Sequence, residues 1–156
     1  MSVEESKKKE VVSHMAALCS RSEQCSPDIR KKIIAGGLSE IEAAEVINYL
    51  KQEKYIDDER YVKAYVAEKF RINKWGRIKM KYYLRMKGLS DDIIEAGMEA
   101  LDEKKYVDLL QKTMKEKARK IKNKNKFEKM GQIIRYTQGR GFEPELIHRY
   151  MNEVLE

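Results

Sequence analysis

The sequence is poor in the residues that build cross-linked, metal-bound or membrane-spanning proteins. Its 156 residues include only two cysteines, two histidines and two prolines. No apolar run reaches the roughly 18 residues that a membrane-spanning helix needs, so we expect no membrane segment. Cys19 and Cys25, taken with His14 and His148, make no spacing that holds zinc. We expect reduced thiols and no bound metal.

The sequence also lacks a set of groups that would support catalysis. The histidines and cysteines form no nucleophile and base pair at a suitable spacing. Asp57 and Asp58 allow two interpretations, a catalytic carboxylate pair or the start of a helix. Because no base, nucleophile or metal ligand accompanies them, we favour the helix start and expect no enzyme. The first nine residues lack the apolar stretch of a secretory signal, which predicts a cytoplasmic protein.

Charge, in contrast, is abundant and unevenly distributed. Charged residues make up 38% of the chain, and the formal net charge is +7. Residues 1–56 are neutral overall, residues 57–105 carry a net charge of +2 and residues 106–156 carry +5. The segments 60–87 and 112–129 hold ten and nine basic residues with few acidic ones. Such segments favour a polyanionic partner, and a merely solvated lysine-rich surface is the alternative.

A short pattern occurs three times at nearly equal spacing. Glycine, a large apolar residue and a helix-capping residue or its substitute stand at 37–39, 88–90 and 141–143, which gives spacings of 51 and 53 residues. A repeat of this length indicates one helical unit used three times. Abundant Glu, Lys, Met and Leu favour helices as well. We therefore predict an all-α protein of tandem three-helix units, an architecture that offers long surfaces to other macromolecules.

The repeat sets the predicted domain boundaries. We expect a flexible N-terminal tail at 1–8, followed by three-helix units at 9–56, 57–104 and 105–156. The first helix should then cover about 9–21.

Capping signals place further helix ends. Ser26-Pro27-Asp28 should start a helix with serine as its cap, and Ser39 begins a capping box. Asp57 should cap the first helix of the second unit. Gly88 and Gly141 should end helices in the left-handed conformation that glycine adopts most readily.

Three segments need a choice between interpretations. Ile78 to Tyr82 alternates like a strand, but the repeat equates it with helices, so we predict a helix over about 76–87. Gly139-Arg140-Gly141 reads as a helix stop, because a phosphate loop needs a preceding strand and more glycines. The highly charged stretch 115–126, with two asparagines, predicts a loop.

Basic residues of the middle unit define a predicted binding face. In a regular helix starting near Asp58, the basic side chains of residues 60, 63 and 71 fall on one side. Arg77, Lys81 and Arg85 stand four residues apart in the next helix, and Lys74 lies between the two helices. Like charges at this spacing repel each other, which favours an external anion, either nucleic-acid phosphate or an acidic protein groove. We expect the nearby aromatic residues in the core rather than as platforms for bases.

Four motifs, taken in order, resemble the RecX family of bacterial regulators of the recombinase RecA. They are Cys19-Ser20-Arg21-Ser22, the segment 55–62 (YIDDERYV), the segment 76–89 (GRIKMKYYLRMKGL) and Gly139-Arg140-Gly141-Phe142. Each motif alone is weak, whereas their order and spacing over about residues 11–156 are specific. The resemblance implies that the three units form an elongated, curved helical array without a cofactor.

The resemblance also implies a function. Family members of this kind bind the RecA–DNA filament and inhibit the recombinase, ATPase and coprotease activities of RecA in DNA repair, DNA recombination and the SOS response. We accordingly expect a cytoplasmic monomer whose partners are the RecA filament and single- and double-stranded DNA. The alternative is a helical module that binds DNA of any sequence without a recombinase.

The family's basic positions in the middle unit fall on Lys69, Lys79, Lys81 and Lys87. The predicted contact residues, from the helix face and the resemblance together, are Arg60, Lys63, Lys69, Arg71, Lys74, Arg77, Lys79, Lys81, Arg85 and Lys87.

Overall fold

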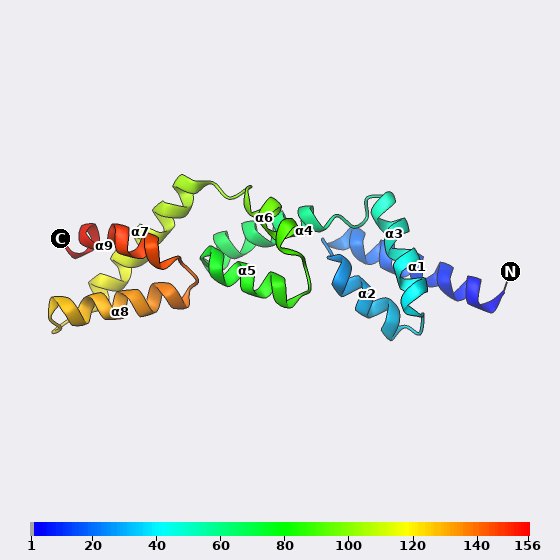
Figure 1. Ribbon diagram of the computed structural model, residues 1–156, viewed down its shortest axis with the longest axis horizontal. Helices are drawn as coiled ribbons and strands as arrows, with labels where there is room; N and C mark the ends of the chain where they lie inside the picture. Colours follow the sequence, from blue (N-terminus) through cyan, green and yellow to red (C-terminus); the bar gives the residue numbers. More distant parts are fainter. Residues whose placement is uncertain (1) are drawn as a thin grey trace. The chain divides into compact units, whose positions relative to one another are not determined.

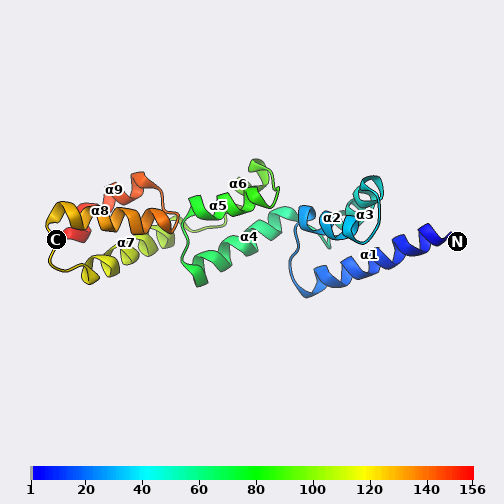
Figure 2. The same cartoon turned by 90° about the horizontal axis from the view of Figure 1, so that it is seen from below.

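The computed structural model describes residues 2–156, and every regular element in that range is a helix (Figures 1 and 2). The all-α prediction is therefore confirmed. The helices in chain order are α1 (Val3–Arg21), α2 (Ser26–Ala35), α3 (Glu40–Gln52), α4 (Asp58–Glu68), the π-helix η1 (Lys69–Asn73), α5 (Arg77–Met86), α6 (Asp91–Met98), α7 (Glu103–Lys120), α8 (Lys126–Gly139) and α9 (Pro144–Leu155).

Contacts between residues divide the chain into two compact units. The first contains the residues up to Ala64 and Arg85–Gly97, and the second contains Tyr65–Leu84 and Met98–Glu156. Helices α4, α5 and α6 each contribute to both units. The division into three units at the expected boundaries stays a prediction.

The core of the first unit lies among α1, α2 and α3. Apolar residues three or four apart, such as Ile29 and Ile33 on α2 and Val46 and Leu50 on α3, are almost fully buried. This spacing places them on one face of each helix, and α1 adds Met15 to the same core. The close packing of α3 against both neighbours can be followed in Figure 2.

Two helix starts in this unit differ from the predictions. Helix α1 begins at Val3, because the Ser2 side chain accepts a hydrogen bond from the amide of Glu5 and acidic residues fill the first turn. The start near residue 9 is therefore wrong. Cys25, rather than Ser26, stands at the N-cap position of α2 and makes no side-chain capping bond, while the Ser26 hydroxyl donates to Asp58 on α4. The predicted capping box at Ser39 is confirmed, with Glu42 as its partner.

The core of the second unit lies among α7, α8 and α9, with Tyr106, Met114, Ile133, Phe142 and Ile147 fully buried. The predicted loop over 115–126 is wrong in its first half. Helix α7 continues to Lys120 because its apolar face still packs on this core, and only residues 121–125 connect it to α8. Phe142 before the cap and Pro144 in the first turn begin α9 as predicted.

The glycine motifs at Gly76 and Gly141 hold the start of α5 against the turn between α8 and α9. Gly88 and Gly141 have φ angles of 100° and 97°, which confirms both left-handed helix ends. The amide of Gly76 donates to the carbonyl of Arg140 over 2.7 Å, and the amide of Ile78 donates to the carbonyl of Gly141 over 2.9 Å. These bonds satisfy amides that a helix start leaves without intrahelical partners. The strand interpretation of this segment is excluded, because α5 is helical.

Candidate nucleic-acid interface

The two aspartates that open α4 are structural. Asp57 accepts a hydrogen bond of 3.0 Å from the amide of Arg60 and so caps its own helix. Asp58 is buried and accepts hydrogen bonds from the amide and the hydroxyl of Ser26, at the start of α2. The helix-start interpretation is confirmed, and no cluster of potential metal ligands occurs among residues 2–156.

Arg60 and Lys87, both predicted contacts, bind carboxylates of their own chain. The Arg60 guanidinium lies 2.8 Å from Glu23 and also donates to the carbonyls of Lys54 and Tyr55. The hydrogen bond from Arg60 to Glu23 raises the pKa of Arg60. Lys87 lies 2.9 Å from Asp28, and this hydrogen bond raises the pKa of Lys87. Both side chains stabilise the first unit.

Arg77, another predicted contact, is partly enclosed, with 19% of its side chain exposed. It pairs with Glu103 and, over 2.7 Å, with Glu143, while its amide donates to the hydroxyl of Tyr106. Burial opposes the charge of Arg77, but the hydrogen bond to Glu143 and the nearby charges of Glu143 and Glu103 together outweigh burial and raise the pKa of Arg77. Burial and the hydrogen bond to Glu143 likewise raise the pKa of Tyr106. Arg77 therefore joins α5 to α7 and α9.

Carboxylates of the chain itself also lie next to other basic residues of the predicted binding face. Arg85 lies 2.8 Å from Asp91, and Lys63 lies 3.4 Å from Glu59. Repulsion among these residues therefore favours an external anion less than expected, since Arg77 and Arg85 have acidic partners within the chain. Whether these residues also contact a partner stays a prediction.

Two of the other three lysines at the positions that the resemblance implies, Lys69 and Lys79, meet at a ring instead. Lys69 Nζ lies 5.1 Å and Lys79 Nζ lies 4.8 Å from the centroid of the Trp75 ring. Trp75 stacks on Tyr83 with centroids 5.2 Å apart and planes 25° apart. Both distances from lysine to ring fall within the range of cation–π attraction. We name these four residues, all in the second unit, the Trp75 cluster.

The π-helix positions this cluster. Lys69 opens η1, and its carbonyl accepts hydrogen bonds from the amides of Lys74 and Trp75. Lys74 ends the element in the left-handed region, with a φ of 57°, so the chain turns back and Trp75 meets Lys69. Arg71 lies within η1, and the face that it was predicted to share with Arg60 and Lys63 stays a prediction.

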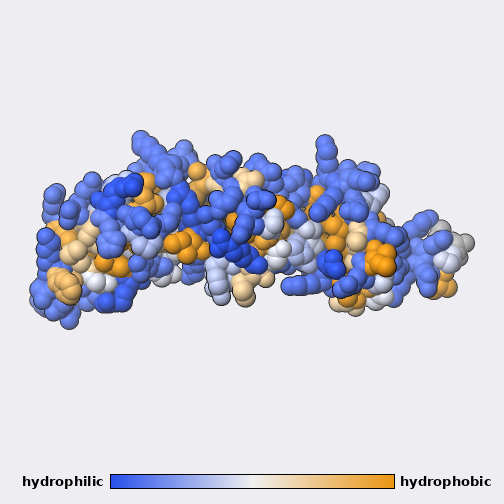
Figure 3. All heavy atoms as spheres, viewed as in Figure 1, coloured by the Kyte–Doolittle hydropathy of each residue, from blue (hydrophilic) through white to orange (hydrophobic). Residues whose placement is uncertain are grey.

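The aromatic residues of this region are more exposed than expected. Tyr82 is 55% exposed and Tyr83 is 42% exposed, and their rings meet edge to face. The expectation that the nearby aromatic residues lie in the core is wrong for these two. Arg71 and Lys74 are exposed as well. Hydrophilic residues with hydrophobic ones scattered between them cover the face of the molecule seen in Figure 3.

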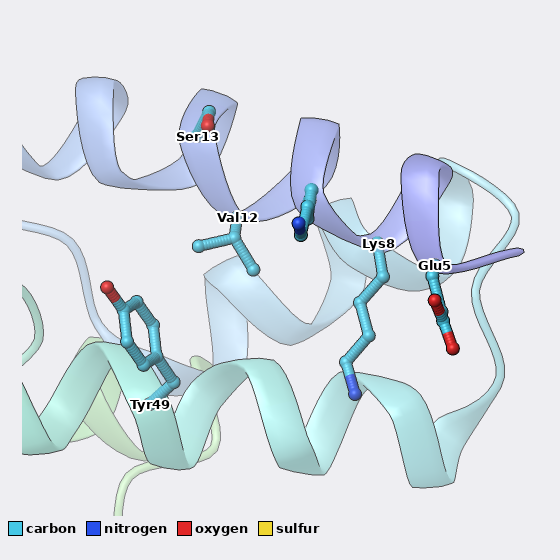
Figure 4. A pocket seen from close by; sticks show the side chains of 6 residues that line it. Glu5, Lys8, Val12, Ser13 and Tyr49 are labelled. Carbon is cyan, nitrogen blue, oxygen red and sulfur yellow. The ribbon is translucent and has the colours of Figure 1, made fainter. Parts of the chain in front are cut away.

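A separate hollow lies on the first unit, between α1 and α3 (Figure 4). Val12 on α1 and Tyr49 on α3 give it apolar lining, and Glu5, Lys8 and Ser13 on α1 add polar groups. Lys8 pairs with Glu45. This mixture contains no nucleophile and base pair and indicates no catalytic chemistry.

Sequence reasoning missed Tyr83 and gave Trp75 no role. Trp75 lies two residues before α5 begins, so it stands outside the helical periodicity that includes Tyr83. The signal that could have found them is the only tryptophan of the chain lying among lysines. That composition is typical of surfaces that bind nucleic acid.

Comparisons with known proteins agree with this fold. Residues 57–98 match the family model described as RecX, second three-helix domain. A regulatory protein RecX from Clostridium tetani is 29% identical over 137 residues, which are 86% of this chain and 62% of that protein. One from Bacillus pumilus is 30% identical over 127 residues, 81% of this chain and 46% of that protein. The chain thus spans about three fifths of the length of the first relative.

The solved structures show the same fold. The crystal structure of RecX from Lactobacillus salivarius has a TM-score of 0.88 at 19% identity, covering 96% of this chain and 97% of that one. A second RecX crystal structure has a TM-score of 0.82 at 18% identity, covering 94% of this chain and 73% of that one. Among residues 2–156, no helix is both long and apolar enough to cross a membrane. From the matched middle helices, the relatives and the shared fold together, the chain belongs to the RecX family.

Proposed function

We propose that this protein is a non-enzymatic regulator that binds the RecA–DNA filament and inhibits the recombinase, ATPase and coprotease activities of RecA. It acts as a monomer in the cytoplasm, in DNA repair and recombination. The relatives are named regulatory proteins RecX, and that name supports the regulatory part of the proposal.

The observation that carries the proposal is the Trp75 cluster with its basic surroundings. Lys69 and Lys79 stand at the family's basic positions, and both converge on one ring. Arg71 and Lys74 add exposed positive charge on the adjoining π-helix and turn. A polyanionic filament is attracted to such a surface, and contacts to its phosphates tolerate any sequence.

Adding the purified protein to RecA on DNA tests the proposal. We expect ATP hydrolysis and strand exchange to fall as the protein approaches stoichiometry with RecA. Unchanged rates at a large stoichiometric excess would reject it.

The alternative is a DNA-binding module that needs no recombinase. The net charge of +7 favours it. It requires tight binding to bare DNA that weakens steeply with salt, together with unaltered RecA activity.

A further inference from the structure

A second group of cations and an aromatic ring lies on α7 and α8. Lys117 Nζ lies 5.0 Å from the centroid of the Tyr136 ring, and the guanidinium carbon of Arg140 lies 5.8 Å from it. Tyr136 is 40% exposed, and the two cations are partly exposed. We name these three residues the Tyr136 cluster. None of them was among the predicted contacts.

The two clusters belong to one surface of the second unit. The Arg140 guanidinium donates to the carbonyl of Asn73, two residues before Trp75. Lys79 Nζ donates to the carbonyl of Gly139 over 3.4 Å, three residues after Tyr136. A side chain of each cluster thus reaches the backbone beside the other cluster, and all these residues lie in one compact unit.

The cations of this surface are available to an anion. Among residues 2–156, no carboxylate forms an ion pair with Lys69, Lys79, Lys117 or Arg140, in contrast to Arg60, Arg77, Arg85 and Lys87. Cations left beside exposed rings offer two kinds of contact, to a phosphate and to a flat apolar group.

We infer that this surface binds an unpaired nucleic-acid strand, whose bases stack on the exposed rings while its phosphates contact the cations. The inference rests on the proposed function and deepens it, because it names the part of a nucleoprotein filament that the surface contacts. The residues involved are Lys69, Trp75, Lys79, Tyr83, Lys117, Tyr136 and Arg140.

The rings decide between an unpaired strand and other polyanions. Bases in a duplex stack on each other, so their faces are not accessible, and a duplex would use only the cations. An acidic protein groove would also use the cations and leave the rings without flat partners. Unpaired bases expose their faces, and stacking of these faces on aromatic side chains is tolerant of sequence.

The test is fluorescence anisotropy with the full chain and two labelled probes, an oligo-dT strand and a DNA hairpin with the same number of phosphates. The variant is Tyr136→Leu, which removes the aromatic ring but keeps an apolar, helix-forming side chain. The control is Tyr49→Leu on α3, where the tyrosine is 46% exposed and lies outside the surface.

Loss of one stacked base weakens binding by about five- to one-hundredfold. We therefore expect Tyr136→Leu to weaken oligo-dT binding at least about fivefold, with hairpin binding changed less than about twofold. Tyr49→Leu should bind both probes as the wild type does. Unchanged oligo-dT binding, or equal losses for the two probes, would overturn the inference.

A second variant keeps the test decisive if Tyr136→Leu fails to fold. Lys117→Gln removes one charge from the surface of α7, so the slope of log affinity against log salt for oligo-dT should become shallower by about 0.7. An unchanged slope together with unchanged affinity overturns the inference. RecA is absent from these titrations, so a protein that binds oligo-dT in this way but leaves RecA activity unaltered would disprove only the proposed function.

Discussion

Gly76 and Gly141 lie so close together that neither position has room for a side chain. A Cβ atom on Gly76 would lie 2.3 Å from the carbonyl carbon of Gly141, and one on Gly141 would lie 2.4 Å from the Cβ atom of Lys79. The contact holds the start of α5 against the turn between α8 and α9, and it places Lys79 beside Gly139. Two motifs 65 residues apart in the sequence therefore form one close backbone contact.

Replacing Gly76 should disrupt this close contact. Gly76→Ala forces backbone atoms apart, so we expect the free energy of unfolding to fall by about 3 kcal/mol. Gly139→Ala is the matched control, because a Cβ atom there would meet nothing within 4 Å. The control should be neutral or stabilise by about 0.5 kcal/mol. Urea denaturation of both variants measures the difference, and equal stabilities would show that the backbone can relax at Gly76.

Arg77 should contribute more to the stability of the fold than an exposed arginine does. Arg77→Met leaves Glu143 without its ion-pair partner and the Tyr106 ring without the guanidinium above it, so we expect a loss of about 2 kcal/mol. Arg71→Met on η1 removes the same charge from an exposed position and should change stability by less than about 0.5 kcal/mol. Thermal melting followed by circular dichroism compares the two. A similar small effect at both positions would mean that the Arg77 pairs contribute little.

The ion pair between Lys87 and Asp28 predicts a pH dependence. Burial alone would raise the pKa of Asp28, but the hydrogen bonds from Lys87 and Cys25 and the charge of Lys87 together outweigh burial and keep the pKa below its usual value of 3.8. The contribution of the pair is therefore complete above about pH 4 and is lost as the pH falls through the lowered pKa. Lys87→Met should cost about 1 kcal/mol at pH 7 and clearly less near pH 2.

Lys63→Met is the control for that comparison, because Lys63 pairs with Glu59 four residues away on an exposed helix face. Its effect should be a few tenths of a kcal/mol at pH 7. If Lys87→Met were equally destabilising at both pH values, the contact of the Lys87 ammonium with the Tyr61 ring, rather than the ion pair, would explain the loss.

Trp75 reports on its own cluster, because it is the only tryptophan in the chain. Its ring is partly exposed between Lys69 and Lys79, so a bound strand should change its fluorescence emission. We expect oligo-dT to change the emission in a saturable way and added salt to reverse the change. Saturable binding by anisotropy without any change in Trp75 emission would place the strand elsewhere.

Local signals in the sequence predicted most of the helices. The capping box at Ser39, the cap at Asp57 and the left-handed ends at Gly88 and Gly141 each depend on a few neighbouring residues. The prediction failed where a distant residue decides the outcome. The hydroxyl of Ser26 bonds Asp58 instead of capping α2, which no local pattern indicates.

The candidate site was harder to predict for the same reason. The local sequence around a basic residue on a helix is the same whether its side chain contacts solvent, a phosphate or a distant carboxylate. Arg77 proved to bind Glu143, 66 positions away, whereas Lys79 lies on Trp75. The π-helix and the turn at Lys74 bring that ring to the lysines, and neither follows from hydrophobic periodicity.

Charge reversal at the Trp75 cluster tests the central claim most directly. The variant carries Lys69→Glu and Lys79→Glu, and the control carries Lys104→Glu and Lys105→Glu in the exposed first turn of α7, where acidic residues favour the helix. The variant and the control change the net charge of the protein by the same amount. In a RecA ATPase assay on single-stranded DNA, we predict that the wild type and the control inhibit alike and that the variant is at least about tenfold weaker. Equal inhibition by all three proteins would contradict the account.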